Sequence, residues 1–275
     1  MHSAPRQSRN HARTAVILAG GQGTRLRPYT VTLPKPLVPV GERPILEIII
    51  GQLARDGFTR VIVAVGHMAE LIEAYFGDGS QWGLTIEYAR EGEPLGTAGP
   101  LGSVANALPT HFLVLNGDVL CDLDYGAFLT QHMQHPDEPV LTVSTHRRTL
   151  LSEYGVLQTN TRGHLTAYFE KPTYDLAVSE GIYAFSREAL TWIPPQQRFD
   201  FPDLVNALLT AHQTVIAAEH DGLWLDIGRP DDYERAQDLV AADPHLFPSP
   251  RTAGRVQTDG QPARSHERNV ISPSS

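Results

Sequence analysis

Glycines and cations lie close together near the amino end of the chain, and their types suit the binding of phosphate. Residues 18–30 read Leu-Ala-Gly-Gly-Gln-Gly-Thr-Arg-Leu-Arg-Pro-Tyr-Thr. Glycine permits a sharp turn that directs backbone N–H groups at an anion with no Cβ in the way. Arg25 and, ten residues later, Lys35 add positive charge, and the prolines on each side of Lys35 hold its backbone extended. The pattern predicts a cradle for a triphosphate. Its glycines are Gly20, Gly21 and Gly23.

Two familiar phosphate-binding loops do not fit this segment. A Walker loop closes with Gly-Lys-Ser/Thr, which is absent from the sequence. A dinucleotide fingerprint needs a third glycine where Arg25 stands and an acid at the end of the second strand, where the chain has Gly66 and His67. An ordinary glycine-rich turn remains the alternative. It does not explain why Thr-Arg is followed by Pro-Lys-Pro.

The combined pattern resembles the sugar-1-phosphate nucleotidyltransferases, also called sugar nucleotide pyrophosphorylases. Their signature L-A-G-G-x-G-T-R-L-x-P-x-T, followed by P-K-P-x-x-P-V, is matched across residues 18–40. The resemblance continues at Asn-Gly-Asp (116–118), Glu-Lys-Pro (170–172) and Asp-Ile-Gly (226–228), so it spans most of residues 14–242. Each later motif is weak alone, but their order along the chain is that of the family.

The resemblance implies that Asp118 and Asp226 bind Mg²⁺, a cation that one or two carboxylates usually hold together with water and substrate phosphate. For an isolated aspartate, a strand-end cap or a turn is the commoner role. The resemblance also implies that Lys171 grips the sugar-1-phosphate, that Glu170 accepts hydrogen bonds from sugar hydroxyls, and that Gly155 lies near the sugar. The alternative for Glu170 and Lys171 is an exposed charged pair before a turn. The implied nucleotide contacts are Leu18, Ala19, Gly20, Gly21, Gly23, Thr24, Arg25, Glu93, Gly96 and Thr97.

The position of Ser179 departs from the family. Many relatives carry Asn-x-Gly-Ile-Tyr, whose asparagine contacts the sugar, whereas this chain reads Ser-Glu-Gly-Ile-Tyr at 179–183. A hydroxyl in place of the amide puts the usual hexose contacts in doubt.

The residue at position 93 bears on the choice of base. Thymidylyl- and uridylyltransferases of the family typically have glutamine in the string that here reads Glu-Pro-Leu-Gly-Thr-Ala-Gly (93–99). Guanine presents two adjacent donors, N1–H and N2–H, which a carboxylate complements. Glu93 therefore favours GTP, unless it simply faces solvent. This string resembles guanylyltransferases for mannose-1-phosphate and for heptose-1-phosphate. The segment Asp-Ile-Gly-Arg-Pro-Asp-Asp-Tyr (226–233) is closest to that of the short heptose enzymes.

The expected reaction transfers a nucleoside monophosphate from an NTP to a mannose- or heptose-like sugar-1-phosphate and releases pyrophosphate. The attacking phosphate oxygen is already anionic, so catalysis would rest on alignment and on charge neutralisation by Arg25, Lys35 and Asp118 with its metal. Three alternatives stay open: another base, another sugar- or cyclitol-1-phosphate, and a regulatory paralogue without turnover. A nicotinamide-dependent oxidoreductase fails on the fingerprint.

Apolar runs rich in β-branched residues alternate with amphipathic segments from Thr14 to about Ala242, which predicts parallel strands crossed over by helices. Strands are expected at 14–19, 60–65, 84–90, 111–118, 139–146, 155–159, 165–170, 181–186, 214–219 and 223–227. Helices are expected at 44–56, 68–76, 97–107, 187–192, 202–212 and 231–240. The fold class is α/β, with a Rossmann-like, mainly parallel sheet flanked by helices.

The expected organisation is a flexible N-terminus (1–13), one domain (14–242) and a flexible tail (243–275). A nucleotide-binding lobe (14–138) and a sugar-binding lobe (139–242) would share one sheet. The tail is rich in Pro, Ser, Arg, Gln and Gly and too poor in apolar residues to offset its ordering entropy.

Composition narrows the functional classes further. The 275 residues include 22 Lys+Arg against 31 Asp+Glu, a formal charge of −9 that argues against a nucleic-acid partner. No stretch approaches the ~20 apolar residues of a membrane span. One cysteine and no secretory leader predict a cytoplasmic protein. A homo-oligomer is compatible with the sequence, which does not fix the number of copies.

Overall fold

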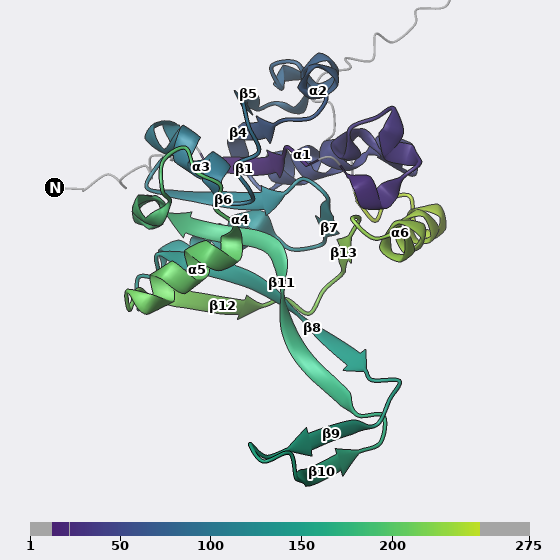
Figure 1. Cartoon of the computed structure of the whole chain (residues 1–275). Coiled ribbons are helices and arrows are strands. Elements are labelled where there is room, and N and C mark those ends of the chain that lie inside the picture. Colours follow the sequence, from purple (N-terminus) through teal and green to yellow (C-terminus); the bar gives the residue numbers. More distant parts are fainter. Residues whose placement is uncertain (1–12, 22, 248–275) are drawn as a thin grey trace, which may run out of the picture.

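A computed structural model describes residues 13–21 and 23–247 of the chain. Its centre is a seven-stranded sheet in which β1 pairs in parallel with β4 and β6, β4 with β5, and β8 with β12, while β11 runs antiparallel to β6 and β8 (Figure 1). The mixed, mainly parallel sheet confirms the predicted fold class. In spatial order the strands are β12 (Val215–Glu219), β8 (Leu141–Leu151), β11 (Thr173–Ser186), β6 (His111–Asn116), β1 (Arg13–Ala19), β4 (Phe58–Val65) and β5 (Thr85–Arg90).

Helices cover both faces of this sheet, which explains why the strands are apolar throughout rather than alternating. Along β1, Ile17 packs into one core with α1, α2, α4 and α6, and its neighbour Val16 packs into a second core with α3 and α5. Burying one such side chain contributes about 1.5–3 kcal/mol. The helices are α1 (Ile45–Arg55), α2 (Ala69–Phe76), α3 (Gly99–Val104), α4 (Tyr125–Met133), α5 (Phe201–Thr210) and α6 (Pro230–Ala242).

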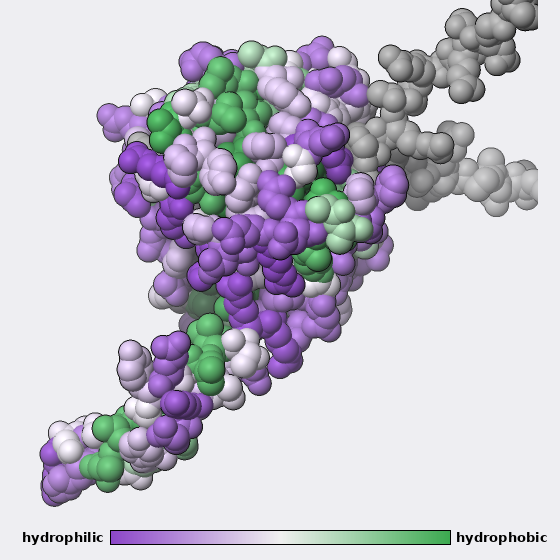
Figure 2. Space-filling model, turned by 90° about the vertical axis from the view of Figure 1, so that its right-hand side faces the viewer, coloured by the Kyte–Doolittle hydropathy of each residue, from purple (hydrophilic) through white to green (hydrophobic). Residues whose placement is uncertain are grey.

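Two strands of the sheet continue beyond it and form a projection, which we call the arm (residues 147–177). Here the outer part of β8 pairs with the first part of β11, and the hairpin of β9 (Val156–Thr159) and β10 (Leu165–Phe169) forms its tip (Figure 1). Hydrophobic surface is visible along the arm in Figure 2. Its exposed apolar side chains are Leu150, Leu151, Tyr154, Leu157, Leu165, Tyr168, Phe169, Tyr174 and Leu176.

A two-stranded sheet joins segments that are far apart in the sequence. Strand β7 (Val119–Cys121) pairs antiparallel with β13 (Trp224–Asp226), so that Asp226 lies opposite Val119. The main-chain N–H of Ile227 donates to the carbonyl of Asp118 at 2.9 Å. This pairing brings the two predicted metal ligands to the same place. Another short pair is β2 (Pro39–Val40) with β3 (Arg43–Pro44).

The structure differs from the expected elements in a few places. Helix α4 was not predicted, and 187–192 is a 3₁₀ helix. The predicted tail begins with residues that pack on the body, because Phe247 is 1% exposed and joins the core. The remainder of the predicted tail (248–275) and residues 1–12 lie outside the described residues. No helix in the described part of the chain is long and apolar enough to cross a membrane.

Candidate active site

A pocket of about 440 Å³ lies where β1 and β6 end, at the edge of the sheet where open α/β folds bind ligands. Its walls come from the glycine-rich loop, the segment around Lys35, the loop after β5, the Asn-Gly-Asp turn and the segment before α5. The lining residues are Leu18, Ala19, Gly20, Gly21, Arg25, Lys35, Pro36, Glu91, Pro94, Gly96, Thr97, Pro100, Asn116, Gly117, Asp118, Arg198 and Asp200.

The glycine-rich loop turns sharply as it leaves β1. Gly23 has a φ of 61°, in the left-handed region that favours glycine, and the Thr30 hydroxyl donates to its carbonyl at 2.8 Å. A 3₁₀ turn over Thr24–Leu26 follows, and Arg25 within it lines the pocket. Gly23 and Thr24 support this turn but are not among the lining residues.

Lys35 is an 8% exposed residue that begins a 3₁₀ turn over Lys35–Leu37. The turn is closed by a hydrogen bond of 3.0 Å from the N–H of Val38 to the carbonyl of Lys35. Its ammonium forms an ion pair with the Asp118 carboxylate. A nearly buried ammonium requires such a partner, and the pair places one cation and one anion at the pocket wall.

Asp226 lies against the same cluster, although it is not a lining residue of the pocket. A Cβ placed on Gly228 would lie 2.8 Å from Asp226 Oδ1, 3.0 Å from Lys35 Nζ and 3.4 Å from Arg25 Nη2. Two cations and two carboxylates therefore meet around one point, and any side chain at Gly228 would intrude between them. The donor set suits Mg²⁺, because carboxylate oxygens from two chain segments converge beside a pocket that Arg25 and Lys35 line.

The loop after β5 forms the opposite wall. Glu91 accepts a hydrogen bond of 3.2 Å from the N–H of Leu95, and burial raises the pKa of Glu91. Gly96 has a φ of 82°, and a Cβ there would lie 2.6 Å from Asp200 Oδ1. The N–H of Thr97 donates to the same oxygen at 2.9 Å. The loop is thus fastened to Asp200, the N-cap residue of α5.

Seven of the ten predicted nucleotide contacts line the pocket, while Glu93 is exposed and stands outside the lining set. Four lining residues with polar or charged side chains were not among the candidates from sequence: Glu91, Asn116, Arg198 and Asp200. Asp200 had a local signal, because it precedes Phe-Pro-Asp at the start of a predicted helix, where an acidic N-cap is common. That signal identifies a cap and says nothing of a pocket.

The predicted sugar contacts fall into two groups. Ser179 lies beside the pocket: its hydroxyl accepts from the N–H of Gly181 at 3.3 Å, and a side chain on Gly181 would collide with Asn116, which lines the pocket. Glu170 and Gly155 are packed against Tyr168 in the arm, where Tyr168 donates to Glu170 at 2.8 Å. Lys171 is exposed on the same arm. The structure does not bring these three arm residues to the pocket.

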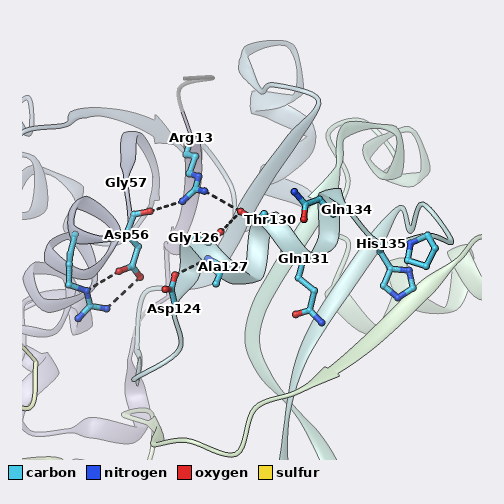
Figure 3. A pocket seen from close by; sticks show the side chains of 12 residues that line it. Arg13, Asp56, Gly57, Asp124, Gly126, Ala127, Thr130, Gln131, Gln134 and His135 are labelled. Atoms are coloured by element: carbon cyan, nitrogen blue, oxygen red, sulfur yellow. Dashed lines mark hydrogen bonds and ion pairs between the residues drawn. The ribbon is translucent and has the colours of Figure 1, made fainter. Parts of the chain in front are cut away.

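A larger cavity of about 900 Å³ lies at the other end of β1, between α1 and α4 (Figure 3). Arg13 spans it, donating to the carbonyl of Asp56 at 2.8 Å and to the Thr130 hydroxyl at 3.1 Å. Asp124 is engaged as the N-cap of α4 through a 2.7 Å bond from Ala127. These polar groups fasten helices together at the amino edge of β1. We therefore assign the smaller pocket, which holds the converging charges, as the site.

Comparison with known proteins identifies relatives of the chain. A family model described as nucleotidyl transferase matches residues 14–243. The UTP–glucose-1-phosphate uridylyltransferase of Synechocystis sp. is 37% identical over 243 residues, which cover 81% of this chain and 62% of that protein's length. The mannose-1-phosphate guanylyltransferase of Mycobacterium tuberculosis is 34% identical, covering 89% and 68%. The structure of HddC from Yersinia pseudotuberculosis complexed with GMP-PN has 26% identity and a TM-score of 0.64, covering 82% and 99%.

Proposed function

The chain belongs to the nucleotidyl transferase family, and on that premise we propose that it transfers a nucleoside monophosphate from an NTP to a sugar-1-phosphate. The observation that carries the proposal is the convergence of Arg25, Lys35, Asp118 and Asp226 at one pocket. These groups come from three separate motifs of the sequence. The transfer of a nucleotidyl group needs cations and metal-binding carboxylates at one place, and these four residues meet at the carboxyl edge of the sheet.

The residues act by alignment and by neutralising charge. The sugar-1-phosphate oxygen attacks the α-phosphorus of the NTP, a new P–O bond forms, and the bond to pyrophosphate breaks. Because the nucleophile is already an anion, no side chain has to remove a proton. Arg25 and Lys35 hold the phosphates of the NTP and stabilise the negative charge that leaves on pyrophosphate.

A divalent cation, for which we propose Mg²⁺, would be held by Asp118 and Asp226. When bound, such an ion supplies Lewis-acid stabilisation of phosphate oxygens. With such an ion held by Asp118 and Asp226, Lys35 would be free of its ion pair with Asp118 and could face phosphate.

We propose that the arm carries Glu170 and Lys171 to the sugar-1-phosphate by closing on the pocket. The arm is a two-stranded ribbon, a structure that is only marginally stable alone, and it exposes apolar side chains that closure would cover. Ser179 presents a hydroxyl to the sugar in place of an amide. This departs from the usual hexose contacts, and we favour a mannose- or heptose-like acceptor because residues 93–99 and 226–233 resemble guanylyltransferases for those sugars.

GTP is the favoured donor in this proposal. Glu93 precedes Pro94, which lines the pocket, on the loop that Gly96 and Asp200 hold, and its carboxylate would accept from both guanine donors. The guanylyltransferase similarity and the HddC structure with GMP-PN support the same choice. The uridylyltransferase similarity at 37% identity supports UTP as the second candidate.

The test is a pyrophosphate-release assay that crosses GTP, UTP, dTTP, ATP and CTP with hexose-, heptose- and cyclitol-1-phosphates. We expect the highest kcat/KM with GTP and a mannose- or heptose-like acceptor, and none without a divalent cation. Equal or greater turnover with UTP would replace the guanylyl assignment. Absence of pyrophosphate release in every combination, with NTP binding intact, would favour a regulatory paralogue.

A matched pair of variants tests whether Glu93 distinguishes guanine from uracil. Glu93→Gln should lower kcat/KM for GTP by about tenfold or more and spare UTP, because an amide loses one acceptor for guanine. Glu91→Ala should weaken the binding of all nucleotides alike, because it removes the acceptor that holds the N–H of Leu95 in this loop and not a contact to the base. If Glu93→Gln changes GTP and UTP equally, Glu93 does not read the base.

A further inference from the structure

Two imidazoles and a carboxylate meet at the root of the arm, outside the nucleotide pocket. His146 is the last residue of β8 before the arm, Glu180 lies on β11, and His220 follows β12. Glu180 Oε1 lies 2.8 Å from His220 Nδ1 and 3.6 Å from His146 Nδ1. One nitrogen or oxygen from each residue lies within 4.8 Å of the others. None of the three lines the pocket assigned above.

The Glu180 carboxylate needs a positive charge at this place. Its side chain is wholly buried, with 0% exposure. Within the described part of the chain no lysine or arginine pairs with it; its partners are the Ser144 hydroxyl and the two histidines. An isolated carboxylate buried in this way would cost many kcal/mol. That positive charge must therefore come from a proton, on Glu180 itself or on an imidazole, or from a bound cation.

Asp122, the second carboxylate near the cluster, determines which ring nitrogen of His220 carries a proton. Nε2 of His220 lies 2.9 Å from Asp122 Oδ1, and since an ionised carboxylate only accepts hydrogen bonds, Nε2 must carry the proton. The neutral ring then turns a bare lone pair on Nδ1 toward Glu180, which is repulsive unless a proton or a metal ion lies between them. Metal-binding histidines characteristically donate their other N–H to a carboxylate in this way.

We propose that His146, Glu180 and His220 bind a divalent transition-metal ion of the zinc class, with Asp122 orienting His220. A proton on His220 would account for its approach to Glu180, and His146 Nδ1 also lies 3.0 Å from the carbonyl of His220, to which it can donate. A bound metal ion would take one donor from each of the three side chains. Two imidazole nitrogens and one carboxylate oxygen form a donor set that zinc uses in proteins, with a further position for water. Mg²⁺ prefers oxygen ligands, so this site is chemically distinct from Asp118 and Asp226.

The position of the site suggests what the ion stabilises. His146 lies on β8 and Glu180 on β11, so their contact joins the two paired strands from which the arm extends (Figure 1). The indole N–H of Trp224 donates to the carbonyl of Glu180 at 3.1 Å, and Trp224 lies on β13, which ends at Asp226. A bound ion would therefore fix the base of the arm and the strand of a proposed catalytic-site aspartate. The inference does not depend on the proposed reaction, because it concerns metal binding alone.

The experiment measures metal binding directly on the full chain. Wild-type protein stripped with a chelator, exchanged into Zn²⁺ and then dialysed should retain about one equivalent by elemental analysis, and Co²⁺ should give visible d–d absorption that Zn²⁺ displaces. His220→Ala and Glu180→Gln should lose both signals. His111→Ala is the matched control, because His111 also lies beside another imidazole, that of His132, but pairs with no carboxylate in the described residues. It should bind as the wild type does.

A fourth variant separates the metal site from a loss of folding. Asp122 is half exposed, so Asp122→Asn should fold normally while weakening Zn²⁺ binding by about 10–100-fold. Circular dichroism of each variant checks its fold. Retention by the wild type of no more Zn²⁺ than a folded His220→Ala protein would overturn the proposal and assign the compensating charge in this cluster to a proton. Unchanged Zn²⁺ affinity in Asp122→Asn would overturn the orienting role.

Discussion

Lysine is rare in this chain, and both of its lysines stand in motifs of the proposed site. The 22 basic residues comprise 20 arginines and only Lys35 and Lys171. An ammonium is a compact charge on a flexible stem, whereas a guanidinium is a broad planar fork. The space around Lys35 Nζ is narrow, because a Cβ at Gly228 would already lie 3.0 Å from it. Position 35 therefore suits an ammonium specifically.

Replacing Lys35 should reveal this requirement. Lys35→Ala removes the cation that faces the phosphates, so kcat for pyrophosphate release should fall by about 10²–10³, and Lys35→Arg should recover little of it. Arg60→Ala is the control, since Arg60 pairs with Glu87 outside the pocket and should leave turnover unchanged. Near wild-type release by Lys35→Ala would contradict the proposed mechanism.

Among single residues, the sequence predicted as pocket residues those that belong to local motifs. Gly20, Arg25, Lys35 and Asp118 all line the pocket, as the signature implied. Residues such as Arg198 escaped prediction, because an isolated arginine in a segment before a helix has no local pattern that marks it as pocket-lining. Its place follows only from the packing of α5 beside the loop after β5.

At the scale of elements, hydrophobic periodicity predicted nearly every buried strand and helix. It missed α4, a helix of nine residues with a glycine in its first turn and a weakly amphipathic face. It also predicted only the inner parts of β8 and β11. Their outer parts are paired with each other alone and exposed on the arm, so no buried face imposes the alternation that marks a strand.

The N-cap of α5 should have a second role that other caps lack. Asp200→Ala should cost about 1 kcal/mol of stability, the usual loss for a cap, and should also release Thr97 and the loop after β5. We therefore expect KM for the NTP to rise by about tenfold, which corresponds to ~1.4 kcal/mol. Asp124→Ala removes the cap of α4 in the other cavity. It should cost similar stability in urea titrations but leave KM unchanged; an equal rise in KM would argue against the assigned pocket.

At the scale of the whole molecule, the site exists because parallel strands deliver their carboxyl ends to one edge. The glycine-rich loop follows β1 and the Asn-Gly-Asp turn follows β6, its immediate neighbour in the sheet. The sequence indicated those ends but not the pairing of β7 with β13, since a three-residue strand has too little pattern to identify its partner. The direction in which the arm projects is likewise set by long-range pairing rather than by local signals.

Stability of the whole fold should depend on pH through a histidine between helix and sheet. His132 on α4 is 3% exposed and hydrogen-bonded to Thr142 at 2.9 Å, and burial lowers its pKa to about 4 from an ordinary 6.5. Between these values the unfolded chain binds a proton that the native chain does not. The free energy of unfolding should therefore fall as pH drops from 6.5 to 4, by about 3 kcal/mol from this group.

Urea titrations across this pH range check the expectation. His132→Asn keeps an amide near the Thr142 hydroxyl but cannot titrate, so its stability should fall less steeply toward pH 4. His212→Asn is the control: His212 is exposed with a φ of 55°, a conformation that asparagine tolerates. Its slope should equal that of the wild type. Equal slopes for all three proteins would show that His132 does not titrate on unfolding.

Closure of the arm should be visible through the two lysines, because acylating reagents modify few other amines on this chain. In the described structure Lys171 is exposed on the arm and Lys35 is nearly buried. With GTP and a divalent cation, Lys35 should become still less reactive while Lys171 reacts as before. Adding a sugar-1-phosphate should slow acetylation of Lys171 several-fold, as read from peptide masses, because its ammonium then pairs with phosphate and leaves solvent.

Inorganic phosphate in place of the sugar-1-phosphate is the control. It should protect Lys171 only weakly, because it offers no sugar hydroxyls to Glu170. Unaltered reactivity of Lys171 with both substrates bound would mean that the arm stays extended and that the sugar-1-phosphate is held by other residues.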